Sequence, residues 1–540
     1  GWLPELWLPE DLLNRTDAFL SSGDAELEAF RAQLVAEVGE RRAAVLLPML
    51  ANRPLWPVED LDGAGRAVAD ALRRAGAAPY FAGFAASFAG SNAWAIPASR
   101  SATGAPLVAN DPHRPLTSPS LRYLIHLKAP GWNVIGAASP WLPGVVIGHN
   151  EHVAWGMAAF PANTEDVRVE PLDRAHDVIV KDALRVKRSK PFAFDREYTA
   201  HGVVIASDRE HGRVFTLGWA GFEPGAASDL GALALDRAES LGDLQTAIAK
   251  WKMPVVEFVF ADNTTVGRQV SGLDARASSA SSAPVPIAAN ENVARTSRLK
   301  QLLSGDKKYS VDDLKRQQHD AMSWNAEILV PRLASAHAAD ARVEDARRQL
   351  LAWDRRVAPE SPAGTLYVRW EQALWRRIAG EHVPTTLLDA YLAHVPFEVE
   401  DALKARDGVM LGALASAVNP ESAADAGNRI VVFRHPLAIT QAARRRFDVG
   451  PFSPGGDAET VMAFSKKSGL DVGASFRQIL DVADWDRSVA TSAPGQSQWT
   501  NSPHFADLAA LWARGEYFPL PFSDRAVRQH AETTLILQPR

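Results

Sequence analysis

The stretch Gly90-Ser91-Asn92-Ala93-Trp94-Ala95 lies where the character of the sequence changes. The residues before it, 77–90, are mostly Ala, Gly and Ser with interleaved aromatics, a composition typical of a linker. After it, short runs of alternating apolar and polar residues predict half-buried strands. The clearest run has apolar residues at Leu121, Tyr123, Ile125 and Leu127. The strand-rich part of the chain therefore begins at Ser91.

Helical patterns lie on both sides of these strands. Residues 1–76 are expected to be helical, with Gly39 as a plausible stop for one helix. One face of that helix would carry Leu27, Phe30, Leu34 and Val38. A second helical pattern, rich in Ala, Leu, Arg and Asp, covers residues 310–417, and short strands with Gly, Pro and Ser loops follow it. The sequence therefore predicts an α+β fold.

The composition is that of a globular protein and excludes several kinds of function. The 540 residues are 46% hydrophobic, which is enough for a sizeable core. Cysteine is absent, so disulfides, thiolate zinc sites and cysteine nucleophiles are excluded. The net charge of −6 gives no broad attraction for nucleic acid or acidic membranes. The most apolar run, 77–90, is shorter than the about 20 residues of a membrane span, and none is expected.

The common catalytic motifs HExxH, Walker A, GxGxxG and GxSxG do not occur in the chain. Two partial matches point to penicillin-recognising serine enzymes: Ser297-Arg298-Leu299-Lys300 fits SxxK, and Lys467-Ser468-Gly469 resembles the KTG box. The SxxK pattern often occurs by chance in a chain of this length. A β-lactam-opening enzyme with Ser297 as nucleophile is therefore kept only as a minor alternative.

Several short sequences together resemble the penicillin acylase family of N-terminal-nucleophile hydrolases. Gly90-Ser91 is followed by Asn110-Asp111-Pro112-His113, by Leu-Pro-Gly-Val-Val-Ile-Gly-His-Asn at 142–150 and by Ala-Trp-Gly at 154–156. The later matches keep the family's order: Trp353-Asp354, Gly455-Gly456-Asp457, Ala493-Pro494-Gly495-Gln496-Ser497, Ser502-Pro503-His504 and Pro519-Leu520-Pro521-Phe522. The resemblance implies the family's four-layer αββα sandwich, with helical insertions that include residues 310–417.

The resemblance also implies a precursor that cuts itself between Gly90 and Ser91. Residues 91–540 would form the β subunit of a heterodimer. Residues 1–76 would be a helical portion of the α subunit that starts part-way through it, and 77–90 would be the end of a spacer. Cleavage would free the α-amine of Ser91, whose unperturbed pKa is about 7.7 to 8.0. That amine can then take the hydroxyl proton, through a bridging water, so that one residue supplies nucleophile and base.

The remaining catalytic roles are carried over by position. His113 lies where the family places Gln or His against the serine, and histidine there resembles the acyl-homoserine-lactone and cephalosporin acylases; the alternative is a histidine that bonds a turn. The backbone N–H of the oxyanion hole falls at Ala159, or at Phe160 in relatives shifted by one. Its side-chain donor would be Asn290, supported by Arg295, although the segment before them is shorter than usual and an exposed loop Asn is the alternative.

The resemblance further implies a substrate pocket and a structural metal. Trp141, Trp155 and Phe160 are candidates for the wall of an apolar acyl pocket, or are simply core residues. The family's Ca²⁺ joins the two subunits through oxygen ligands. The matching positions here, which are otherwise just solvated loop residues, are Glu26, Asn163, Glu165 (through its carbonyl) and Asp166.

We therefore expect an amidohydrolase that deacylates acyl-homoserine lactones, acylated β-lactams or both, through an acyl-Ser91 ester. A periplasmic or secreted location is expected by the same resemblance, with no organic cofactor. The alternative of a different class is a catalytically silent or unprocessed relative that binds acyl ligands. The presence of Gly90, Ser91 and His113 together argues against it.

Overall fold

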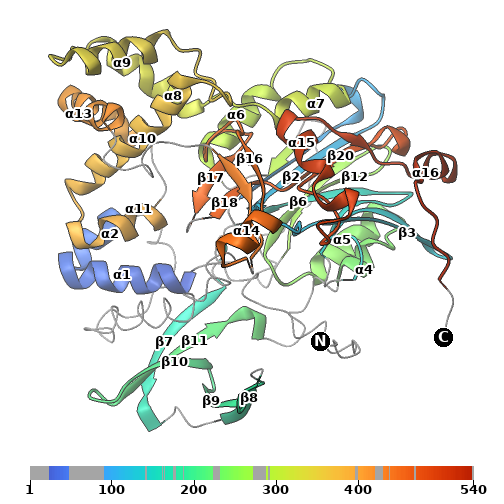
Figure 1. Ribbon diagram of the computed structural model, residues 1–540, viewed down its shortest axis with the longest axis horizontal. Coiled ribbons are helices and arrows are strands. Elements are labelled where there is room, and N and C mark those ends of the chain that lie inside the picture. Colours follow the sequence, from blue (N-terminus) through green and yellow to red (C-terminus); the bar gives the residue numbers. More distant parts are fainter. Residues whose placement is uncertain are drawn as a thin grey trace.

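Two antiparallel sheets, stacked face to face, form the centre of the computed structural model (Figure 1). The residues that it describes are 24–47, 90–139, 143–160, 162, 164–173, 178–185, 188–222, 231–271, 287–289, 292–395, 399–419, 430–436, 438–467 and 470–537. The first sheet contains, in order, β14 (Ile287–Ala289), β1 (Ser91–Ile96), β2 (Leu107–Pro115), β19 (Phe476–Asp481), β20 (Val489–Ser492) and β21 (Phe518–Pro519), with β18 (Leu470–Ala474) and β17 (Phe464–Lys467) attached to β2. The second contains β13 (Val266–Val270), β12 (Val256–Ala261), β6 (Ala154–Ala159), β5 (Ile147–His149), β4 (Trp132–Ala138) and β3 (Tyr123–Ala129).

Helices cover the outer face of each sheet. On the first sheet lie α6 (Val293–Leu302), α7 (Val311–Gln318) and α15 (Asp507–Arg514); on the second lie α4 (Ala232–Leu235) and α5 (Leu241–Lys250). Strand β1 shows how the layers meet, because its side chains alternate between two cores. Ala93 and Ala95 face the second sheet, whereas Trp94 and Ile96 pack with residues of α6 and α7. This is the expected four-layer αββα sandwich.

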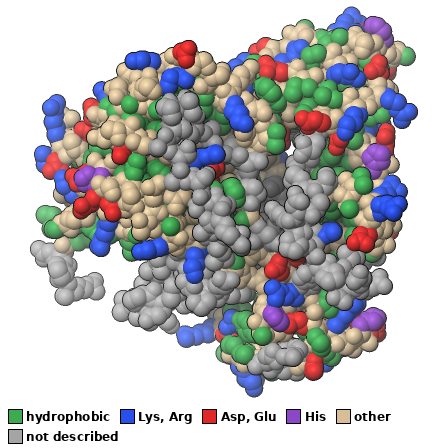
Figure 2. All heavy atoms as spheres, turned by 180° about the vertical axis from the view of Figure 1, so that it is seen from behind, with side chains coloured by type: hydrophobic (Ala, Val, Ile, Leu, Met, Phe, Trp, Pro, Cys, Tyr) green, Lys and Arg blue, Asp and Glu red, His purple; other side chains and the backbone are tan. Residues whose placement is uncertain are grey.

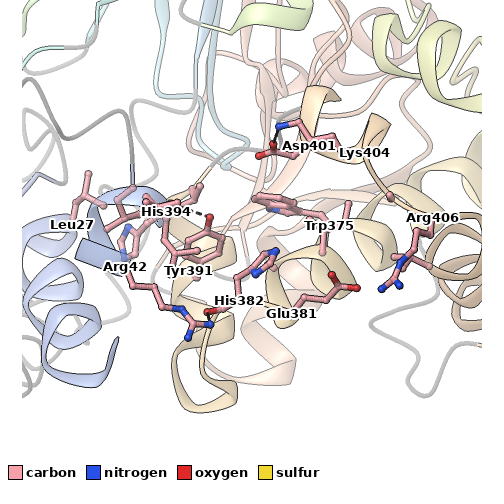
Figure 3. A pocket seen from close by; sticks show the side chains of 18 residues that line it. Leu27, Arg42, Trp375, Glu381, His382, Tyr391, His394, Asp401, Lys404 and Arg406 are labelled. Carbon is pink, nitrogen blue, oxygen red and sulfur yellow. Dashed lines mark hydrogen bonds and ion pairs between the residues drawn. The ribbon is translucent and has the colours of Figure 1, made fainter. Parts of the chain in front are cut away.

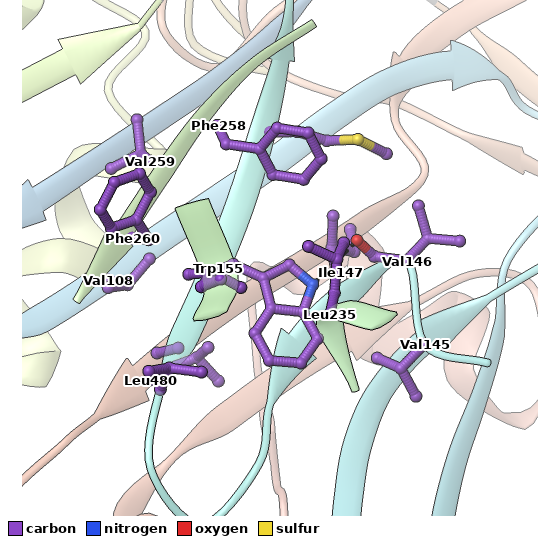
Figure 4. Packing of buried hydrophobic residues seen from close by; sticks show 14 of the residues in the cluster. Val108, Val145, Val146, Ile147, Trp155, Leu235, Phe258, Val259, Phe260 and Leu480 are labelled. Atoms are coloured by element: carbon purple, nitrogen blue, oxygen red, sulfur yellow. Dashed lines mark hydrogen bonds between the residues drawn. The ribbon is translucent and has the colours of Figure 1, made fainter. Parts of the chain in front are cut away.

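The core between the two sheets is built from β-branched and aromatic residues, as Figure 4 shows. Trp155 lies at its centre and donates its indole N–H to the carbonyl of Val146 at 3.0 Å. Val108 and Leu480 pack against it from the first sheet and Phe258 from the second. This hydrogen bond joins β6 to the residue before β5 within the second sheet and satisfies the buried indole, which would be costly to leave without a partner.

A helical arm extends from the sandwich. It contains α8 (Trp324–Leu329), α9 (Ala341–Ala352), α10 (Pro362–Gly380), α12 (Val399–Leu403) and α13 (Asp407–Val418), which share one hydrophobic core. The sequence predicted helices over 310–417, and helices do occupy this range, but its first helix, α7, belongs to the outer layer of the sandwich. The arm begins at α8 because the apolar residues of α7 face β19 and β2.

The helices near the N-terminus dock on this arm. Helix α1 (Asp24–Val38) ends before Gly39, whose φ is +80°, so the predicted helix and its stop are confirmed. Together with α2 (Glu40–Leu46), it packs Phe30 and Leu34 against Trp375 of α10 and Tyr391 of α11 (Leu388–His394). The predicted linker 77–90 lies outside the described residues except for Gly90.

A separate five-stranded sheet lies beyond α1 (Figure 1). Its order is β7 (Glu165–Pro171), β11 (Arg213–Trp219), β10 (Gly202–Asp208), β9 (Phe192–Thr199) and β8 (Val178–Leu184). Strand β7 packs on α1, while every residue of β8 is exposed. The remaining elements are β15 (Val431–Phe433), α14 (Gln441–Phe447), β16 (Val449–Phe452) and α16 (Asp524–His530).

Within the described residues, no helix is long and apolar enough to cross a membrane. Figure 2 shows acidic and basic side chains interspersed over the face that it draws, with no large patch of one sign among the coloured residues.

Candidate active site

Ser91 is the first residue of β1, which lies between β14 and β2 in the first sheet, and Ser91 itself pairs with Pro112 of β2. It is only 1% exposed, and its hydroxyl donates to the carbonyl oxygen of Gly90 at 2.6 Å. Gly90 has a φ of +127°, a conformation that residues with a side chain rarely adopt. The serine hydroxyl therefore lies against the carbonyl of the bond before it.

His113 reaches the same region from β2 and is held at both ring nitrogens. A guanidinium N–H of Arg295 lies 3.0 Å from Nδ1, and Oδ2 of Asp111 lies 2.9 Å from Nε2. Because a guanidinium can only donate, Nδ1 accepts, and the proton sits on Nε2 and is donated to Asp111. Burial lowers the pKa of His113 well below its usual value, and Arg295 and Arg114 lower it further. The imidazole is therefore neutral at pH 7.

Asp111 organises the polar cluster beneath Ser91. Its Oδ2 also accepts from Nδ2 of Asn92 at 2.8 Å, and its Oδ1 accepts from Nε2 of Gln318 at 3.4 Å. Burial raises the pKa of Asp111 to about 7, while the charge of Arg477, the hydrogen bond from Asn92 and the charge of Arg295 act in the opposite direction. Asp111 and His113 therefore form a hydrogen-bonded pair inside the protein.

The end of β6, where the predicted oxyanion donors lie, is tied to the nucleophile strand through Asn110. Its side-chain amide donates to the carbonyls of Asn92 at 2.7 Å and Met157 at 2.9 Å, and it accepts from the Met157 N–H at 3.2 Å. Gly156 permits this approach, since a Cβ there would lie 2.7 Å from the Asn110 Cβ. Ala159 and Phe160 follow two and three residues after Met157, and their role as donors stays a prediction.

Arg295 and Asn290 were predicted to act together. Asn290 lies outside the described residues, but Ala289, directly before it, pairs with Ala93 of the nucleophile strand. Arg295 is buried in the first turn of α6 and contacts His113. The structure thus adds a contact of Arg295 that the sequence did not predict, and the pairing with Asn290 stays a prediction.

The three predicted wall residues differ in their surroundings. Trp141 lies outside the described residues, and Phe160 is half-buried just after β6. Trp155 is completely buried in the core between the sheets. This is the core position that the sequence left open as the alternative for Trp155.

Of the predicted calcium ligands, Glu165 and Asp166 have described side chains, and both lie where β7 packs on α1. Glu165 is buried, and its carboxylate accepts from the Ala25 N–H at 3.4 Å, whereas the Asp166 carboxylate lies 3.6 Å from Arg168. Asn163 and the side chain of Glu26 lie outside what the structure describes. Among the described residues, no three His, Asp or Glu side chains gather as a metal site would require. Calcium at this junction stays a prediction.

A pocket of about 560 Å³ lies elsewhere, between α1, α2 and the arm (Figure 3). Trp375 and Tyr391 line it, and Arg42 at its rim donates to the carbonyl of His382 at 2.8 Å. None of the candidate catalytic residues lines this pocket.

The SxxK serine, Ser297, is half-buried in the middle of α6, and Lys300 is exposed.

Several residues of the site were missed from the sequence. Asp111 and Asn110 lie in a quoted motif. Asp111 alternates with His113 along the strand, so their shared face could have been inferred, whereas Asn110 falls on the opposite face. Gln318 and Arg477 carry no such signal, because they come from α7 and β19, more than 200 residues further along the chain.

The comparisons begin with the fold. The structure is similar to that of the thermostable penicillin G acylase from Alcaligenes faecalis, with a TM-score of 0.59 and 17% identity over 83% of this chain and 100% of that one. The four layers, with Ser91 at the start of a central strand, are the fold of the N-terminal-nucleophile hydrolases.

The family follows from the sequence comparisons. The penicillin amidase family profile matches residues 1–292 and 277–529, so the chain belongs to that family and is an amidohydrolase. Among its curated relatives is penicillin acylase 2 proenzyme from Pseudomonas sp. (strain SE83), 26% identical over 83% of this chain and 69% of the relative. Another is the acyl-homoserine lactone acylase QuiP from Pseudomonas aeruginosa, 23% identical over 100% of this chain and 80% of the relative.

Proposed function

We propose that this protein hydrolyses N-acyl amides through an acyl ester on Ser91, after its precursor has cut itself between Gly90 and Ser91. The observation that carries the proposal is the position of the Ser91 hydroxyl. It is buried at the start of a central strand and lies 2.6 Å from the carbonyl oxygen of the bond to be cut.

In the mature enzyme, the α-amine of Ser91 takes the proton of its own hydroxyl, through a water, as the oxygen attacks the substrate carbonyl. The backbone N–H at Ala159 or Phe160 and the side chain of Asn290 stabilise the resulting oxyanion. The amine product leaves with that proton, and water then hydrolyses the ester. His113, neutral and held by Asp111 and Arg295, supports the nucleophile without adding a charge beside it.

The substrate class that we propose first is the acyl-homoserine lactones, with acylated β-lactams second. One relative is named for the first class and another for penicillin. We place the acyl-homoserine lactones first because His113 resembles the residue at that position in the acyl-homoserine-lactone and cephalosporin acylases. A location in the periplasm or outside the cell fits this family, and it is proposed on that ground alone.

The mature enzyme would be a heterodimer whose subunits stay together after cleavage. The contacts of α1 and α2 with the rest of the chain are apolar: Phe30 and Leu34 pack on Trp375 and Tyr391, and Ala25 and Ala29 pack on Val167 and its neighbours in the five-stranded sheet. Burial of such side chains stabilises an interface by about 25 cal/mol per Å². Cutting one bond at Ser91 leaves these contacts in place.

The test is the intact mass of the purified protein under denaturing conditions, for the natural sequence and for Ser91→Ala. Cleavage predicts fragments of 90 and 450 residues, roughly one sixth and five sixths of the total mass, with serine at the new N-terminus. Ser91→Ala should stay a single chain of 58.5 kDa. A single chain for the natural sequence as well would favour the silent or unprocessed relative and overturn the proposal.

A further inference from the structure

Two hydrogen-bond donors converge on the carbonyl oxygen of Gly90. The backbone N–H of His113 donates to it at 2.9 Å, and a guanidinium N–H of Arg114 donates to it at 3.2 Å. The Ser91 hydroxyl approaches the same oxygen at 2.6 Å. This carbonyl therefore has a backbone donor, a charged donor and a hydroxyl around it, whereas an ordinary strand carbonyl needs one partner.

Arg114 is held in this orientation by its surroundings on β2. The same guanidinium nitrogen donates to the carbonyl of His113 at 2.8 Å, which bends the side chain back toward its own strand. The residue directly opposite on β18 is Gly473. Arg114 itself is half-buried, so its guanidinium is partly shielded from water.

We propose that the His113 N–H and the Arg114 guanidinium form the oxyanion-binding site of the self-cleavage step, distinct from the oxyanion hole that serves the substrate. This inference rests on the proposed function, because it assumes that the bond before Ser91 is cut by Ser91. It adds Arg114 as a catalytic residue of maturation, which the sequence did not single out.

The step balances without any group that the chain or water does not supply. Ser91 Oγ bonds to the Gly90 carbonyl carbon, and the carbonyl electron pair moves onto the oxygen that His113 N–H and Arg114 contact. When the intermediate collapses, the C–N bond breaks and the hydroxyl proton ends on the Ser91 nitrogen as a free amine. Water then hydrolyses the ester, which leaves a carboxylate on Gly90 and restores the Ser91 hydroxyl.

Arg114 is expected to have a large effect on the cleavage rate, because a hydrogen bond to a developing oxyanion becomes stronger as the negative charge appears. Removing one such donor typically slows a reaction by about 10² to 10³-fold. Arg114 also carries a full positive charge, and a charged donor is roughly twice as strong as a neutral one. A loss of Arg114 should therefore slow cleavage by about that factor.

The experiment follows cleavage of newly made precursor in a cell-free translation reaction, sampled over time and resolved by intact mass. Arg114→Met, which keeps the length of the side chain without its donors, should cleave about 10² to 10³-fold more slowly than the natural sequence. Arg114→Lys, which keeps the charge, should recover part of the rate. Cleavage of a folded Arg114→Met precursor at the natural rate would overturn the proposal.

The matched control is Arg100→Met. Arg100 is another partly buried arginine that donates to a backbone carbonyl, that of Lys307, at 2.9 Å. Its loss should leave the cleavage rate unchanged, and a slowing equal to that of Arg114→Met would also contradict the proposal. Thermal unfolding of each precursor reports whether it folds; should Arg114→Met not fold, Arg114→Gln takes its place under the same criterion. If the natural sequence itself is not cleaved, the proposed function fails, which is a separate result from a fast Arg114→Met.

Discussion

The first central sheet and the peripheral five-stranded sheet have the same local structure but opposite surroundings. Both are antiparallel, and both contain strands of six to nine residues at their centres. All six residues of β1 are buried, because a second sheet covers one face and helices cover the other. All seven residues of β8 are exposed, because nothing in the described structure covers it. The strand structure is the same in both sheets, so the layers that cover a strand determine whether it can hold a buried site.

The electrostatics of the two sheets differ for the same reason. In the peripheral sheet, Arg196 and Asp182 pair at 2.8 Å with both side chains almost half exposed, so water screens the pair and its contribution to stability is small. In the central sheet, Asp111 and His113 pair at 2.9 Å with almost no exposure, and both pKa values move away from their usual range. Only the covered sheet holds such a pair away from water.

The largest expected effect is on catalysis. Ser91→Ala should lower deacylation of an N-acyl-homoserine lactone by about six orders of magnitude, since loss of a serine nucleophile costs about 2 × 10⁶ in a known case. The measurement is release of the free amine from the lactone. Ser207→Ala, at the exposed position of β10, is the matched control and should leave the rate unchanged. Appreciable activity in Ser91→Ala would place the nucleophile elsewhere.

The second effect is on stability. Phe258→Ala, which empties a fully buried position between the central sheets, should lower the free energy of unfolding by about 3 to 5 kcal/mol. Phe192→Ala, in the peripheral sheet and 62% exposed, should change it by less than about 0.5 kcal/mol. Chemical denaturation of both variants measures the difference. Equal losses would show that the peripheral sheet contributes as much to the cooperative core as the central one.

The third prediction concerns stabilisation by calcium at the junction of α1 and the peripheral sheet. If the family's metal binds there, a calcium concentration of a hundred times Kd should stabilise the protein by about 2.7 kcal/mol relative to the chelated protein. Thermal unfolding with EGTA, and after calcium is added back, measures this. An unchanged Tm under both conditions would remove calcium from the description of this chain.

The smallest effect concerns pH. The lowered pKa of His113 gives stability that is present at neutral pH and lost as pH falls below about 6.5, because only the unfolded imidazole then binds a proton. The raised pKa of Asp111, about 7 against 3.8, acts in the opposite direction between these values, since the folded carboxyl binds the proton first.

Asp111→Asn removes the second contribution and leaves the first. Its free energy of unfolding should therefore fall more steeply than that of the natural sequence between pH 6.5 and 5, by up to about 1.4 kcal/mol per pH unit. Denaturation curves at pH 5, 6 and 7 measure the slope. Asp182→Asn in the peripheral sheet is the control, and identical slopes for the two variants would mean that Asp111 and His113 do not titrate as described.

Much of the fold could be predicted from local pattern. The helix over Leu27 to Val38 and its stop at Gly39, and the change to strands at Ser91, follow from periodicity and backbone preference, which act within a few residues. The helices between 310 and 417 were also expected, but their division between the outer layer and the arm was not. That division depends on which face each helix buries against residues far along the chain.

The site divides in the same way. The sequence by itself determined the candidate nucleophile Ser91, the bond before it and His113, because these residues form short motifs. Only the tertiary structure decided that Arg295 contacts His113, that Trp155 belongs to the core, and that Gln318 and Arg477 surround Asp111. The contacts of Arg295, Gln318 and Arg477 join residues separated by more than 150 positions, and burial, which no single residue type specifies, sets their strength and the pKa values.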